Sequence, residues 1–195
     1  MTIVNKKRDI NIFAVVHDDI PATTTTSIYA EHFQPFVKEL ESFIDRKFNV
    51  VFGRGAPYSQ FNYKGDDPLR TLKSWEILGR QYLELAKAEG FETGPLDQVV
   101  LLTKENLNER TGGAALLWPP LNTGNFAISS LGSRITVGHE VGHLLGARHE
   151  DSEIQYNGWW CETYMTPQPH PLRSICYSFS QKNRENIQNH LASKG

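Results

Sequence analysis

Twelve consecutive residues, His139–Glu150 (HEVGHLLGARHE), gather the side chains of this sequence that are best suited to metal chemistry. His139 and His143 are four residues apart. A helix would place both imidazoles on one face, roughly 5–6 Å apart at Cβ. Two imidazoles at this separation can bind one tetrahedral Zn²⁺. A catalytic zinc site needs a third protein ligand, which has to come from elsewhere in the chain.

Gly146 and His149 complete this predicted ligand set. Glycine tolerates positive φ, so Gly146 can end the helix and turn the chain sharply. His149 can then return to the metal and leave the fourth position open for water. The alternative interpretation is a set of polar surface histidines on an amphipathic helix. That alternative explains the apolar Val141, Leu144 and Leu145, but it does not explain the three histidines and the glycine.

Glu140 is the candidate general base of the site. It follows His139, faces the same side and does not need to bind the metal. Zinc lowers the pKa of a bound water from about 15.7 to about 7, and a neighbouring carboxylate can accept the proton. The hydroxide would attack a peptide carbonyl, and Glu140 would then pass the proton to the leaving amine. The predicted reaction is hydrolysis of a peptide bond.

The remaining sequence predicts the elements that position this segment. Strands and helices alternate early in the chain and a loop-rich tail follows, which predicts an α/β fold with a five-stranded, mixed, twisted sheet. We expect one domain, 1–195, with an N-terminal lobe (1–146) and a small irregular C-terminal lobe (147–195) on either side of a cleft. The predicted strands are Ile10–Val16, Asn49–Gly53, Gln98–Thr103, Gly113–Trp118 and Asn125–Ser129. The predicted helices are Ser27–Phe48 with a start or bend at Pro35, a helix from Asp67 and Pro68 to before Gly90, Ile135–Leu145, and one from a Ser178 cap to about Ala192.

Composition and charge narrow the functional classes. The 195 residues are 39% hydrophobic and 22% charged, as is usual for globular domains. The net charge of −2 and the lack of a basic stripe give no basis for a nucleic-acid or anionic-membrane partner. No apolar run approaches the roughly 18 residues that span a membrane. The early run INIFAVV is interpreted as a core strand and not as a signal peptide.

Cys161 and Cys176 are the two cysteines of the chain and lie fifteen residues apart. This pair fits one disulfide, which would indicate an oxidising compartment, or two free thiols. The spacing alone leaves both alternatives open.

The segment His139–Glu150 resembles the zinc signature of the metzincin metallopeptidases, and the order of predicted elements resembles that clan over most of the chain. The layout is nearest the adamalysin/reprolysin-like branch, which has a similar helix between strands two and three and a cysteine shortly before the methionine. Glu150 after the third histidine is instead similar to the astacins. Pro167 stands where astacins place a metal-binding tyrosine. We therefore expect a divergent metzincin.

The resemblance implies several further features. Met165 would form the methionine turn beneath the metal, the alternative being a gap-filling core side chain. A disulfide between Cys161 and Cys176 and a secreted protein would follow. The expected activity is that of a monomeric zinc endopeptidase that hydrolyses proteins or peptides. Any latency would come from a pro-segment or from a separate inhibitor. The alternative is a peptidase-like module that binds proteins without cleaving them.

The resemblance also implies where a substrate would bind. An extended peptide would pair antiparallel with an edge strand, here Gly113–Trp118, and contact Gly113, Ala114, Ala115 and Leu116. A plain core strand is the alternative. The residues Thr166–Pro171 (TPQPHP), with Thr166 and Pro167 first, would form the outer wall of the pocket for the side chain after the scissile bond.

Other polar and aromatic residues are given structural interpretations. Oxygen donors in Asn62–Asp67 (NYKGDD) could bind Ca²⁺, but the segment lacks a calcium-loop pattern and is interpreted as a solvated turn. Trp159 and Trp160 are expected to pack in the core or to line the cleft, with core packing favoured. The histidines expected at the surface or in satisfied contacts are His17, His32, His170 and His190.

Overall fold

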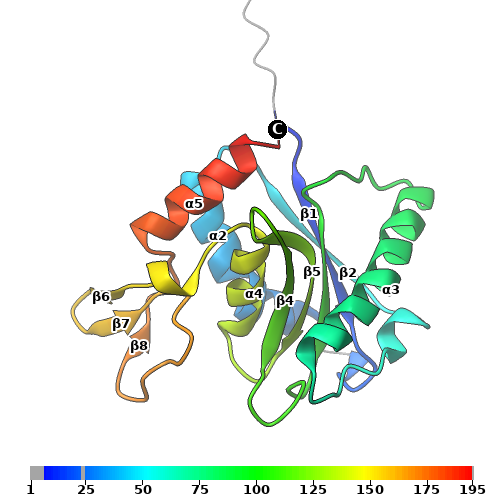
Figure 1. Cartoon of the computed structure of the whole chain (residues 1–195), viewed down its shortest axis with the longest axis horizontal. Coiled ribbons are helices and arrows are strands. Elements are labelled where there is room, and N and C mark those ends of the chain that lie inside the picture. Colours follow the sequence, from blue (N-terminus) through cyan, green and yellow to red (C-terminus); the bar gives the residue numbers. More distant parts are fainter. Residues whose placement is uncertain (1–6, 23–24, 195) are drawn as a thin grey trace, which may run out of the picture.

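A computed structural model describes residues 7–22 and 25–194 (Figure 1). Five strands form one mixed sheet in the order β2-β1-β3-β5-β4. Strands β2, β1, β3 and β5 run parallel to one another, whereas β4 at the edge runs antiparallel to β5. The predicted α/β class and the five-stranded mixed sheet are confirmed. The strands are β1 (Ile10–Val16), β2 (Phe48–Gly53), β3 (Gln98–Thr103), β4 (Gly113–Trp118) and β5 (Thr123–Ser130).

Helices cover both faces of this sheet (Figure 1). On one face α3 (Pro68–Ala88) buries Trp75 against alternate residues of the central strands, such as Phe13 and Leu101. On the other face α2 (Gln34–Phe43) and α4 (Thr136–Leu144) pack on the intervening residues, such as Ile12. Successive strand residues point to opposite faces, so a strand covered on both sides is apolar throughout. This explains why every residue of β1 and β3 is buried.

The C-terminal part of the chain adds a second, small sheet beside α4 and α5 (Figure 1). Its strands are β6 (Ile154–Tyr156), β7 (Trp160–Glu162) and β8 (Ser174–Ile175), in the order β6-β7-β8. Helix α5 (Gln181–Ala192) closes the chain. None of the described helices combines the length and the apolar character needed to cross a membrane.

Two predicted helices differ in detail from the structure. The range Ser27–Phe48 is divided into α1 (Thr25–Ile28), a π-helical turn (Tyr29–Phe33) and α2, with Pro35 in the first turn of α2. Phe48 begins β2 instead of ending the helix. An apolar residue fits the spacing of a helix as well as that of a strand, and in the structure Phe48 pairs with Ile10 of β1. The cap of α5 is Ser180 and not Ser178, since the Ser180 side chain accepts a hydrogen bond from Asn183 N at 3.1 Å.

Close packing holds α4 against the segment around Met165. A Cβ atom added at Gly142 would lie 2.8 Å from the Met165 sulfur and 2.8 Å from a Phe179 ring carbon. At Gly138 it would lie 2.8 Å from the Tyr164 ring. The lack of side chains at these two positions lets α4 approach the C-terminal region closely.

Replacing Gly142 with alanine should therefore destabilise the protein. Overpacking of a core typically costs about 1–3 kcal/mol, which exceeds the roughly 1 kcal/mol that alanine gains over glycine in a helix. A lower midpoint in urea unfolding would show this. Gly132→Ala is the control, because an added Cβ there meets its nearest atom at 3.6 Å. Equal midpoints for the two variants would contradict the packing argument.

Candidate metal centre and groove

Helix α4 carries the first two histidines of the predicted metal site, and a tight turn carries the third. Gly146 ends the helix with φ of +96°, and its N–H donates to His143 O at 3.0 Å. Ala147 N donates to Gly142 O at 2.9 Å, which closes the turn. A positive φ at this position is the conformation in which glycine ends many helices. The chain then reverses and His149 begins a short 3₁₀ turn, His149–Asp151.

The three imidazoles meet through their Nε2 atoms. His149 Nε2 lies 2.9 Å from His139 Nε2 and 3.0 Å from His143 Nε2. Ligand atoms of all three residues lie within 4.8 Å of one another. Two nitrogens bound to one tetrahedral zinc at about 2.0–2.1 Å would be roughly 3.3 Å apart. The structure thus brings the three predicted ligands together at nearly the required separation.

Hydrogen bonds to the backbone fix which ring nitrogen of each helical histidine faces this point. His139 Nδ1 lies 2.7 Å from Tyr164 O, and His143 Nδ1 lies 3.1 Å from Ala147 O. A carbonyl oxygen only accepts, so both Nδ1 atoms carry the proton and both Nε2 atoms present a lone pair. Burial lowers the pKa of His139 to about 3 and that of His143 to about 4, so both rings are neutral at pH 7.

This arrangement fits a cation. Because both Nδ1 atoms are protonated, the Nε2 atoms of His139 and His143 each direct a lone pair at the His149 Nε2 atom. Three neutral imidazoles in this state cannot all hydrogen bond to one another. A divalent ion removes this repulsion by accepting all three lone pairs. Among residues 7–22 and 25–194, these histidines are the one group of three or more His, Cys, Asp or Glu residues placed to hold a metal ion.

Glu140 lies beside the histidines and under the edge strand. A Cβ atom added at Gly113 would come within 2.7 Å of Glu140 Oε1, so the two residues are in close contact. The side chain is almost fully buried, and none of the described residues donates a hydrogen bond to its carboxylate. Burial raises the pKa of Glu140 to about 8, because the charged form loses its hydration. Such a carboxylate binds a proton readily.

The segment after the third histidine contains the predicted disulfide and methionine. Cys161 and Cys176 are bonded, which confirms the disulfide. Met165 is fully buried with its sulfur against Gly142, which directly precedes His143 in α4. The carbonyl that orients His139 comes from the preceding residue, Tyr164. Met165 therefore packs at the base of the site, and its role as a methionine turn remains a prediction.

A groove of about 630 Å³ runs past the histidines. One side is the edge strand β4, represented by Gly113, Ala114 and Ala115. The other side is the segment after Met165, represented by Thr166 and Pro167. Five of the six residues expected at a substrate site thus share one groove. The groove is also lined by Arg110, Thr111, Gly112, Leu117, Ser133, Ile135, Thr136 and Pro169.

Leu116 differs from the other five expected contact residues. It is 1% exposed and packs in the core beneath α3, on the opposite face of β4 from the groove. Leu117 lines the groove in its place. Sequence alternation could have separated these neighbours, because residues 113, 115 and 117 share one face of a strand.

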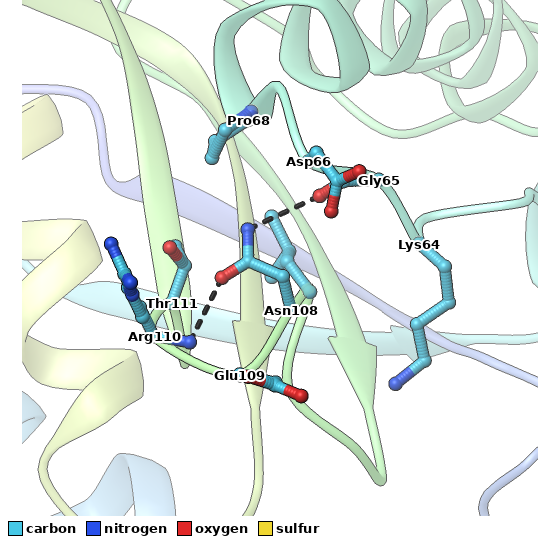
Figure 2. Close-up of a pocket in the computed structure, with 9 residues that line it drawn as sticks. Lys64, Gly65, Asp66, Pro68, Asn108, Glu109, Arg110 and Thr111 are labelled. Carbon is cyan, nitrogen blue, oxygen red and sulfur yellow. Dashed lines mark hydrogen bonds between the residues drawn. The ribbon is translucent and has the colours of Figure 1, made fainter.

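A second hollow of about 630 Å³ adjoins the groove and shares Arg110 and Thr111 with it. Figure 2 shows Asn108, from the loop before β4, pointing towards Gly65 in the loop before α3. The Asn108 amide donates to Gly65 O at 3.1 Å, and its oxygen accepts from Arg110 N at 3.0 Å. Asn108 thus joins the two loops. Lys64, Gly65 and Asp66, from the segment Asn62–Asp67 that the sequence analysis interpreted as a solvated turn, line this hollow.

Several secondary predictions have clear outcomes. Trp159 and Trp160 are 63% and 55% exposed and do not line the groove, so the favoured prediction of core packing is wrong. Trp159 precedes β7 of the small sheet and Trp160 begins it. The Trp160 ring packs edge-on against the exposed Tyr156. In the Asn62–Asp67 segment, Asp67 caps α3 by accepting from Arg70 N at 3.1 Å, which fits a turn.

The four scattered histidines lie outside the metal group. His17 is satisfied by Phe61 O at 3.1 Å and Asp19 at 2.9 Å, and His170 is exposed. His32 and His190 are buried, and the Nδ1 of each has no hydrogen-bond partner among the described residues. His32 keeps a hydrogen bond to the Ser133 backbone, so the expected satisfied position holds for it in part, whereas His190 is buried and not at the surface.

Searches with protein-family models and among curated proteins found no match to the sequence. Solved structures do match. Metalloproteinase-II from Bacteroides fragilis is 18% identical with a TM-score of 0.65, and the match covers 97% of this chain and 55% of that one. Archaemetzincin from Methanopyrus kandleri is 16% identical with a TM-score of 0.51, covering 97% and 99%. A chain in a chaperone-substrate complex is 12% identical with a TM-score of 0.54, covering 97% and 35%.

These likenesses show that the chain has the fold of metalloproteinases. It spans about half the length of metalloproteinase-II. The adamalysin-like branch remains a prediction, because neither metalloproteinase neighbour is described as belonging to it.

We expect bound zinc to stabilise the folded protein strongly. Binding to the folded state alone adds about 4 kcal/mol when free zinc is a thousand times its Kd. Thermal unfolding with and without a chelator would measure the shift. His149→Ala should abolish it, and His170→Ala should retain it because that ring lies outside the group. A midpoint unaffected by zinc in the unaltered protein would rule out the site.

Proposed function

We propose that this protein is a zinc-dependent endopeptidase that hydrolyses peptide bonds of proteins. One observation carries the proposal, namely that three imidazole Nε2 atoms converge beside the Glu140 carboxylate at the floor of an open groove. Structural zinc sites are usually closed and rich in cysteine. Three histidines leave a coordination position free for chemistry.

His139, His143 and His149 would hold the zinc. When bound, zinc acts as a Lewis acid that lowers the pKa of a coordinated water to about 7 and polarises a carbonyl. Glu140 would take up the proton of the attacking water and deliver it to the leaving amine. The backbone carbonyls of Tyr164 and Ala147 hold two of the ligand rings in the required tautomer.

Strand β4 would hold the substrate. It lies at the edge of the sheet, with β5 on one side, so its other side is free of a described strand. An extended peptide could therefore add to the sheet by backbone hydrogen bonds. Gly113, Ala114 and Ala115 line the groove along this strand, and the lack of a side chain at Gly113 lets the strand lie close to Glu140. Thr166 and Pro167 would face the side chain after the scissile bond.

The same proposal covers the wider organisation. Residues 1–146 and 147–195 would form the two lobes of a single catalytic domain, with the groove between them. The disulfide between Cys161 and Cys176 favours an oxidising location, which agrees with secretion. A monomer that is controlled by a pro-segment or by a separate inhibitor is the expected form.

The decisive test replaces Glu140 with glutamine. Cleavage of a denatured protein mixture, followed through new N-termini, should fall by about 10²–10⁴-fold, because general base catalysis contributes that much. The zinc content should stay at one ion per chain.

Glu150→Gln is the matched control for this test. It also alters a glutamate next to a histidine ligand, but Glu150 is exposed and does not line the groove. Its activity should equal that of the unaltered protein. Undiminished cleavage by the Glu140 variant would refute the mechanism. A zinc-loaded protein that binds but never cleaves would instead identify a peptidase-like binding module.

A further inference from the structure

The groove wall formed by Thr166–Arg173 has few means of holding its own position. It contains no helix or strand, and the side chains of residues 167–173 are exposed. Three of its residues are prolines, which have no backbone N–H to donate. From Pro167 to Pro171 only Gln168 and His170 retain one. Neither a hydrophobic core nor a sheet ladder therefore fixes this wall.

A buried carboxylate holds the wall at two points, in addition to a long hydrogen bond from Trp159 Nε1 to Leu172 O at 3.4 Å and a turn bond from Arg173 N to His170 O at 3.0 Å. Glu162, in β7, is 3% exposed. One of its oxygens accepts the His170 backbone N–H at 2.8 Å. The other oxygen pairs with the Arg173 guanidinium at 2.9 Å. Glu162 thus connects the base of the small sheet to the middle and the far end of the wall.

The two ends of the wall are anchored separately. Before it, Met165 is buried against α4, and Thr166 N donates to Thr163 O at 3.1 Å. After it, Cys176 is bonded to Cys161, and Cys176 N donates to Glu162 O at 3.0 Å. Only the exposed arc between these anchors depends on the Glu162 side chain. That arc contains Thr166, Pro167 and Pro169, which line the groove.

We propose that Glu162 is a positioning residue that fixes the wall of the groove and thereby determines which side chain is accepted next to the scissile bond. The proposal rests on the proposed peptidase function. Glu162 itself does not line the groove, so it acts through the wall. Hydrogen bonds to a charged acceptor are stronger than neutral ones, so the two bonds to Glu162 should hold the wall more firmly than the long neutral bond from Trp159 to Leu172 O. A buried carboxylate also needs both partners to compensate for its lost hydration.

The chain offers a close control for this carboxylate. Glu39 of α2 likewise accepts a backbone N–H, that of Phe179, at 2.9 Å. It also binds an arginine, Arg184, at 3.0 and 3.1 Å. Its side chain is 10% exposed, and it does not line the groove. Glu39→Gln therefore removes a similar charge from a similar setting, but it leaves the wall untouched.

Hydrogen exchange tests the anchoring without any activity. In Glu162→Gln, exchange of the His170 amide, which donates to Glu162, should rise about tenfold or more, as expected when a hydrogen bond to a charged group is weakened. Glu39→Gln should leave the exchange of this amide unchanged. Equal protection of the wall in both variants and in the unaltered protein would overturn the proposal.

Substrate selectivity tests whether Glu162 affects which side chain the groove accepts. The substrates are peptides that differ only in the residue after the scissile bond, alanine, leucine or phenylalanine. In Glu162→Gln the ratios of kcat/KM among them should change about fivefold or more, since pocket contacts discriminate side chains by about 10–200-fold. Glu39→Gln should lower the unfolding midpoint and keep the ratios. A shift of the same size in both variants would overturn the proposal.

These two experiments separate failure of this proposal from failure of the proposed function. An unaltered protein that cleaves none of the peptides would contradict the peptidase function, while the exchange experiment would still report on the Glu162 anchor. Active variants with unchanged ratios would contradict the role of Glu162 and leave the peptidase function standing.

Discussion

The arrangement of this protein depends on three imidazole lone pairs directed at one point. Two of the rings are fixed by carbonyls that accept from their Nδ1 atoms, so their Nε2 atoms have no proton to share. Such a cluster is unfavourable in isolation and becomes favourable around a divalent ion. The fold offsets the free-energy cost of holding the three rings together. It does so through a helix packed against the sheet and a glycine turn that brings back the third ring.

The two ends of the chain contribute different parts of this site. The five-stranded sheet and α4 provide the first half. Its central strands are buried on both faces. The region after His149 provides the second half through short strands, a disulfide and a buried methionine. The Tyr164 carbonyl links the halves, because a residue of the C-terminal part orients a ligand on α4. Metal binding and packing of the tail are therefore physically coupled.

Local signals in the sequence predicted most of the elements, and they singled out three histidines that the fold brings together. The histidine spacing, the helix-ending Gly146 and the Asp67 cap are each set by chemistry within a few residues. Predictions that depended on contacts between residues far apart in the sequence were less accurate. Whether Trp160 is buried depends on whether another element covers its side of β7, and the Trp160 side chain is exposed although its neighbour Cys161 is buried. The partners of Glu162 lie eight and eleven residues further on, at positions that only the folded loop brings together.

The position of β4 has a consequence for what this groove could accept. A chain that joins the sheet there has to be extended and has to offer unpaired amide and carbonyl groups. Segments already committed to a helix, or to the interior of another sheet, satisfy neither condition until they unfold locally. Flexible tails, linkers and denatured regions meet both conditions at once. The topology of the sheet would thus favour segments of low local stability as substrates, whatever their side chains.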